Sequence, residues 1–253
     1  MKDDIATVAW KELSQLRPGR GGQRGIAGTV AFLLIVSVAI PFSAGNAKFG
    51  GVGVMAIGLM IAATWVLTSV PDSFAGERDH RTLETLLATR LPADAILAGK
   101  LLATVLAAAA LGTVAIVLSV ISSDVGTAVH GQRGDALSIP WLYMGLGVIL
   151  TVFVAFALSN VGILVALRAS SAMAAMRILG IGLAAITFGI SSGLHALPRG
   201  AASDLDHLAA EIGSLSPWVL TLGAAAIFVV ANAVLFAVTR ARFTRPKLVR
   251  PHG

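Results

Sequence analysis

The chain contains no cysteine and carries little charge. Without cysteine it has no disulfide and no thiolate metal site, an absence that fits any cellular compartment. Only 13% of its 253 residues are charged, whereas soluble domains average about 25%. A further 56% are hydrophobic. This balance excludes an ordinary soluble domain and indicates a membrane protein, whose net charge of +6 favours anionic lipid over nucleic acid as a contact.

The sequence offers no catalytic site. No HExxH motif is present, and no pair of acidic residues lies within an apolar run. An intramembrane protease would need glutamate and histidine clustered inside the membrane, and no apolar run contains glutamate. His195 is the one titratable side chain near the inside of a run, at its outer end, where we expect a structural or interfacial role. We therefore do not expect an enzyme.

A nucleotide-binding P-loop is also missing. Gly99-Lys100 is followed by Leu101 instead of serine or threonine, and position 94 is Asp instead of Gly. If this protein does work driven by ATP, the ATP must bind to another chain.

Six apolar runs lie along the chain, and none contains Asp, Glu, Lys or Arg. Each is near the ~20 residues that a helix needs to cross ~30 Å of hydrocarbon. One charge at a helix centre would cost about 2.5–3.5 kcal/mol on insertion scales. We therefore expect an all-α membrane protein with six transmembrane helices in a single domain, 1–253. The runs cover about 26–44, 50–70, 101–121, 142–167, 178–197 and 218–239.

Lysine and arginine are distributed unequally between the two sides of the membrane. With the N-terminus inside, sixteen lie in cytoplasmic segments, and only Lys48, Arg133 and Arg199 lie in outer loops. Because positive residues favour the cytoplasmic side, we expect both termini, the loop 71–100 and the basic tail 240–253 to be cytoplasmic. The chain would then be a multi-pass protein of a bacterial inner or plasma membrane.

Residues 2–17 have the pattern of an amphipathic helix, which Pro18 ends. Trp10 suits the level of the lipid headgroups. We expect this helix to lie at the membrane interface, and a surface helix without special role is the alternative. Its apolar face comprises Ile5, Val8, Ala9, Leu13 and Leu16.

Two outer loops are longer than the others. Residues 122–141 are polar and show no clear pattern. Residues 198–217 contain a short helix signal that begins with Ser203 as the N-cap and can end at Gly213. We expect this helix to lie at the outer membrane surface or to dip into it.

Within the runs, Asn160 and Asn232 are the polar residues of interest. They either bond between helices as packing residues or line a substrate path. The third run carries a stripe of small residues, for which packing in the core or in a dimer is sufficient explanation. The stripe comprises Ala103, Ala107, Ala108 and Gly112.

The charged segment 73–100 stands out from its apolar surroundings. Leu83, Leu86, Leu87 and Leu91 follow the spacing of a surface helix with one apolar stripe. Pro92 then breaks that helix or starts another at Asp94. Since charged helices do not face lipid, this one lies in water or against a soluble partner; a plain solvated loop is the alternative.

These residues resemble the loop between the second and third spans of ABC-2 type transporter permeases. The family pattern is close to ERE-x-GT-LE-x-LL-x-TP, followed by a short helix and GK. Here the corresponding residues are Glu77-Arg78-Asp79, Thr82-Leu83-Glu84, Leu86-Leu87, Thr89, Ile96-Leu97 and Gly99-Lys100. Lys11-Glu12-Leu13 and Arg17 are similar to the family's interfacial "elbow" helix, and Leu215-Ser216-Pro217 also resembles the family.

The chain departs from the family pattern at three points. His80-Arg81 replaces the usual residue-Gly before the threonine, and Arg90 stands where proline is usual, with Pro92 two residues later. The loop between the first two spans has only a few residues, so the large outer domains of some relatives are missing.

The resemblance implies the membrane subunit of a type V (ABCG-like) ABC exporter. The loop would supply a coupling helix that docks on a separate ATPase subunit, which would bind ATP and Mg²⁺, and two permease copies, identical or related, would form the path. No cofactor is expected in this chain. The alternative is a six-span secondary transporter or a membrane-anchoring subunit without an ATPase partner. The coupling residues implied are Glu77, Arg78, Thr82, Leu83, Glu84, Leu86, Leu87, Thr89 and Lys100.

Overall fold

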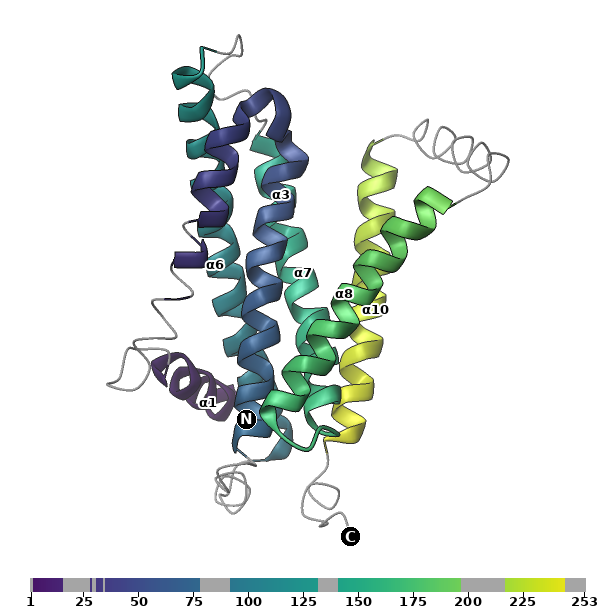
Figure 1. Cartoon of the computed structure of the whole chain (residues 1–253). Coiled ribbons are helices and arrows are strands. Elements are labelled where there is room, and N and C mark those ends of the chain that lie inside the picture. Colours follow the sequence, from purple (N-terminus) through teal and green to yellow (C-terminus); the bar gives the residue numbers. More distant parts are fainter. Residues whose placement is uncertain are drawn as a thin grey trace.

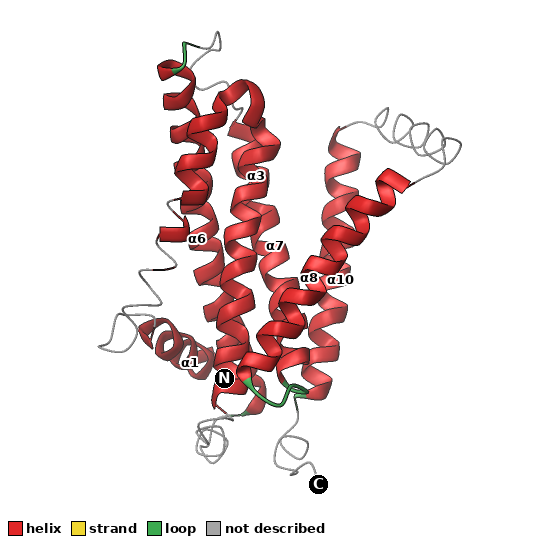
Figure 2. Ribbon diagram, in the orientation of Figure 1, coloured by secondary structure: helices red, strands yellow, loops and turns green. Residues whose placement is uncertain are grey.

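The computed structural model describes residues 2–15, 28, 31–33, 35–77, 92–131, 141–196 and 217–243, and the elements in these ranges are all helices (Figure 2). The expected all-helical class is confirmed for this part of the chain. The elements are α1 (Lys2–Gln15), the π-helix η1 (Ile35–Ala39), α3 (Ile40–Pro71), the π-helix η2 (Asp72–Gly76), α6 (Ala93–Val129), α7 (Trp141–Ala166), α8 (Ala172–Ala196) and α10 (Pro217–Arg242).

Four of the described helices are long and apolar enough to cross a membrane, which indicates a multi-pass membrane protein. The first and fifth predicted runs correspond to shorter apolar stretches, Ala31–Gly45 and Ala172–Ile186, and the count of six spans stays a prediction. The four long stretches are Gly50–Gly76, Asp94–Val129, Met144–Ala166 and Ala225–Arg242.

The long helices form one bundle with α1 at its lower end (Figure 1). α3 packs against both α6 and α7, while α10 packs against α7. α1 lies crosswise to the bundle and packs on α6. α8 and α10 lean away from the other helices toward the upper end of the view.

The stretch Ile40–Pro71 contains two helices joined by a sharp reversal. Gly45 and Gly50 both have positive φ, 65° and 58°, with ψ near 180°. Residues with a Cβ rarely adopt this conformation, so glycine is required at both points. The reversal lies where the sequence separates the first two runs, and that predicted boundary is confirmed.

Helix α6 is longer than its apolar run. It begins directly after Pro92, at Ala93, which agrees with one of the two alternatives for Pro92, the start of a new helix near Asp94, but it ends only at Val129. The interpretation of residues 122–129 as part of an irregular polar loop is therefore wrong. Their hydroxyl groups bond to helix carbonyls: Ser122 donates to the carbonyl of Val38 at 2.6 Å, and Thr127 donates to that of Ser123 at 2.8 Å.

The small residues predicted as a packing stripe are used inside this chain. Ala103, Ala108 and Gly112 are buried. A Cβ added at Gly112 would lie 2.6 Å from Cγ2 of Thr151 and 3.1 Å from the carbonyl oxygen of Gly58. Glycine at position 112 thus allows α3, α6 and α7 to approach closely. The helix expected to begin at Ser203 lies outside the described residues.

Candidate functional site

Lys100 is the largest fully buried side chain among the described residues, with 1% of its side chain exposed. A buried ammonium group is tolerated only when it is paired with opposite charge and fully hydrogen-bonded. Its surroundings therefore indicate how this end of the bundle is built.

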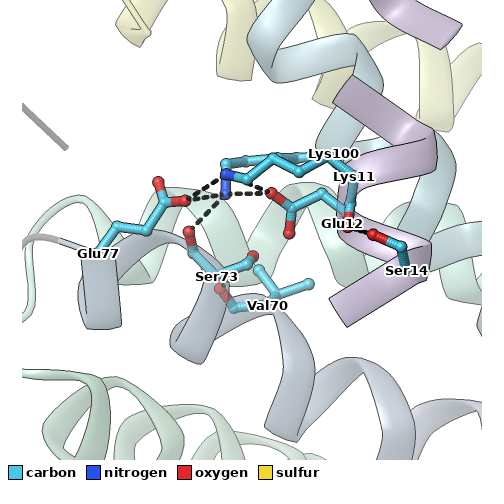
Figure 3. Close-up of polar contacts among 7 residues, drawn as sticks. All are labelled: Lys11, Glu12, Ser14, Val70, Ser73, Glu77 and Lys100. Atoms are coloured by element: carbon cyan, nitrogen blue, oxygen red, sulfur yellow. Dashed lines mark hydrogen bonds and ion pairs between the residues drawn. The ribbon is translucent and has the colours of Figure 1, made fainter. Parts of the chain in front are cut away.

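The Lys100 ammonium group has a partner for each of its three N–H donors (Figure 3). Nζ lies 3.0 Å from Oε1 of Glu12 on α1 and 2.9 Å from Oε1 of Glu77, directly after η2. It also donates to the carbonyl oxygen of Ser73, within η2, at 2.9 Å. We call Lys11, Glu12, Ser73, Glu77 and Lys100 the Lys100 cluster.

Lys11 balances the charge of the cluster. Its Nζ lies 3.7 Å from Oε1 of Glu12 and 3.8 Å from Oε1 of Glu77, and 45% of its side chain is exposed. Two carboxylates therefore face two ammonium groups. Only Lys100 is fully desolvated, so its contacts are the strong ones and those of Lys11 are screened by water.

Gly99 allows α1 to reach Lys100. A Cβ at position 99 would lie 2.6 Å from Cβ of Val8 and 3.1 Å from the carbonyl oxygen of Ile5. Val8 and Ala9 are buried, whereas Trp10 is exposed. The apolar face predicted for this helix thus packs partly on α6, with Trp10 on the opposite side. This packing on α6 and the Lys100 cluster together fasten α1 to the bundle.

The substitution Gly99→Ala is expected to push α1 away from α6. Overpacking of this kind costs about 1–3 kcal/mol, more than the ~1 kcal/mol that alanine gains over glycine in a helix. Gly180→Ala on α8 is the matched control, because no atom of the described residues lies within 4 Å of its added Cβ. Thermal unfolding in detergent and protease cleavage of α1 measure the effect, and Val8→Ala should partly restore the Gly99→Ala variant. Equal stability of the two alanine variants would contradict this packing.

The structure brings two predicted coupling residues, Glu77 and Lys100, into direct contact. Arg78, Thr82, Leu83, Glu84, Leu86, Leu87 and Thr89 fall in 78–91, outside the described residues. Sequence reasoning assigned Glu12 only to an elbow helix and missed Ser73, whose backbone carbonyl leaves no side-chain signal.

Asn160 on α7 and Asn232 on α10 are buried, and each Nδ2 donates to the carbonyl four residues earlier in its own helix. Their acceptors are Phe156 at 2.9 Å and Phe228 at 2.8 Å. Among the described residues, neither amide bonds across helices as expected of a packing residue, and both Oδ1 atoms are buried without a partner. The choice between helix packing and a substrate path stays a prediction.

The described residues show neither of two arrangements that would point to chemical catalysis. They contain no group of three or more His, Asp or Glu side chains that could hold a metal ion. The pentapeptide Gly189–Gly193 has the spacing GxSxG, but it lies inside α8 instead of at a turn between strand and helix. The Lys100 cluster is a buried ion-pair contact, and its chemistry is that of joining helices.

Comparison of the chain with protein-family models, with curated proteins and with solved structures finds no match.

Proposed function

We propose that the chain is the permease subunit of an ATP-driven ABC exporter. It would form six spans with both termini in the cytoplasm, and a second permease copy would complete the substrate path. ATP and Mg²⁺ would bind to a separate ATPase subunit, because this chain has no P-loop.

The Lys100 cluster is the observation that carries the proposal. Its charged residues come from two of the stretches that resemble ABC-2 permeases: Lys11 and Glu12 from the elbow-like helix, and Glu77 and Lys100 from the two ends of the loop motif. The resemblance rests on short motifs that are far apart in sequence. Because residues of these motifs meet at one buried contact, we infer that the motifs act together as one structural unit.

The cluster also suits the transmission of force. Glu77 directly precedes the segment 78–91, and Lys100 lies on α6, the helix that follows it, so the cluster joins the parts of the chain on either side of that segment. A partner that moves the segment would act on α1, η2 and α6 together. A solvated linker would need no such attachment, and its ends would not require a fully desolvated lysine.

The cytoplasmic location of this end follows from the distribution of cations. Sixteen of the nineteen lysine and arginine residues lie in segments on the proposed cytoplasmic side. An ATPase subunit would meet the segment 78–91 there.

Purification of the chain from its native membrane tests the function. We expect an ABC ATPase to co-purify in stoichiometric amount with two permease copies, and the particle to hydrolyse ATP. The control is the same purification with the substitution Leu87→Asp, which should lose the ATPase and keep the permease dimer. A stable monomer that transports substrate without a nucleotide-binding partner would overturn the proposal in favour of a secondary transporter.

A further inference from the structure

Helix α10 is the least buried of the long apolar helices. Only 11% of its apolar stretch is buried, against 33–44% for the other three. Ile227, Val229 and Val230 are exposed in its upper half, and its packing is mainly against α7. Its lower end, in contrast, is held by two specific contacts.

The first contact joins α10 to the Lys100 cluster through an aromatic ring. Phe243, directly after α10, is 2% exposed, and its ring meets that of Phe74 edge-on at 5.9 Å and 88°. The Phe74 ring, which lies within η2, also carries the Lys100 ammonium group 5.3 Å from its centre. Phe74 therefore contacts both Lys100 and the end of α10. Such cation–ring and edge-to-face geometries are both attractive.

The second contact is an ion pair between α10 and the start of α6. Arg240 donates from Nη2 to Oδ2 of Asp94 at 2.7 Å and from Nε to Oδ1 at 3.2 Å. Asp94 lies in the first turn of α6 and Arg240 in the last turn of α10, where each charge opposes the helix dipole favourably. The two-point geometry fixes the direction of approach more than it adds stability, since both side chains are exposed.

We propose that the lower end of α10 is a second point at which movement of the segment 78–91 is transmitted to the membrane helices. Phe74 and the Asp94–Arg240 pair hold this end rigidly to the Lys100 cluster. Movement of the segment 78–91 then displaces α10 together with α6. The contact between the lower end of α10 and the Lys100 cluster is kept throughout the transport cycle, while the sparsely packed upper part of α10 moves relative to α7. This inference rests on the proposed transport function.

Rigid attachment is tested first by crosslinking. The chain has no cysteine, so Asp94→Cys with Arg240→Cys gives two unique sites for a short, reducible, thiol-reactive crosslinker. We expect the crosslinked complex to keep its ratio of substrate transported to ATP hydrolysed within about twofold. Loss of transport on crosslinking and its return on reduction would show that the contact must open, and would overturn the proposal.

The aromatic contact is tested by Phe243→Ala against Phe236→Ala. Phe236 is also on α10, but its ring faces Phe156 of α7 at 6.1 Å. We expect Phe243→Ala to lower the ratio of transport to ATP hydrolysis more than tenfold while ATPase binding is kept, and Phe236→Ala to leave the ratio near wild type. An unchanged ratio in Phe243→Ala would overturn the proposal.

A measurement on the permease alone separates failure of this inference from failure of the proposed function. Spin labels at Leu102 and Val238, both exposed, report the distance between α6 and α10 in lipid. Phe243→Ala should broaden that distance distribution, and Phe236→Ala should not. If no ATPase co-purifies but Phe243→Ala broadens the distance distribution, the proposed transport function fails, whereas the attachment of α10 to the Lys100 cluster is supported. If an ATPase co-purifies but Phe243→Ala leaves the distance distribution unchanged, the attachment of α10 to the Lys100 cluster is overturned and the proposed transport function is not.

Discussion

The substitution Lys100→Met is expected to free α1 from the bundle and to lower the free energy of unfolding by about 3–5 kcal/mol. Methionine fills nearly the same volume but has no charge and no N–H donor. Oε1 of Glu12 and Oε1 of Glu77, which now share one ammonium group at 3.0 and 2.9 Å, would face each other in a mostly dry site. Thermal unfolding in detergent and protease cleavage of α1 measure the loss.

Lys11→Met is the matched control for this prediction. Lys11 faces the same carboxylates at 3.7 and 3.8 Å but is 45% exposed, so its loss should cost at most about 1 kcal/mol. Adding Glu12→Gln and Glu77→Gln to Lys100→Met should recover much of the stability, because no unpaired charge remains. A Lys100→Met variant with wild-type stability and a protected α1 would contradict the role given to the cluster.

The sequence predicts the helices better than it predicts their ends. Apolar runs identify the helices because lipid and core both exclude charge, and the long stretches from Gly50, Asp94, Met144 and Ala225 fall on four of these runs. The same criterion ends the third run at residue 121. Hydropathy does not take into account that the hydroxyl groups of Ser122 and Thr127 donate to the backbone carbonyls of Val38 and Ser123. These bonds let α6 continue to Val129.

The site is predicted residue by residue but not as a contact. Resemblance singles out Glu12, Glu77 and Lys100 separately, and nothing local pairs Lys100 with residues 88 and 23 positions away. The pairing depends on how α1 lies across α6. Gly99 is the nearest sequence signal, because a glycine inside a helix often marks a close approach, but it does not identify the partner.

On the proposed function, the substitution Leu87→Asp is expected to abolish binding of the proposed ATPase subunit, while the chain still inserts and forms the proposed dimer. Leu83 and Leu87 are one helical turn apart, so they present one patch to a partner. A carboxylate at position 87 would have to be desolvated without a counter-charge, which costs several kcal/mol, enough to disrupt a modest interface. Glu84→Ala, beside the patch, should weaken coupling less, because it removes one polar contact. These residues lie outside the described part of the chain, so the spacing alone carries this prediction.

Thr85→Asp is the matched control, because position 85 lies on the opposite face of the predicted helix and its carboxylate stays in water. The measurements are the ratio of ATPase to permease after purification, and ATP hydrolysis and transport in vesicles. We expect the Thr85→Asp variant to bind the ATPase and the second permease copy and to hydrolyse ATP and transport substrate at wild-type rates. We expect the Leu87→Asp variant to lose the ATPase while the yield of permease is unchanged. If Leu87→Asp and Glu84→Ala both retain wild-type association and transport, the segment 78–91 is only a linker. The Lys100 cluster would then fasten α1 to the bundle without coupling it to a partner.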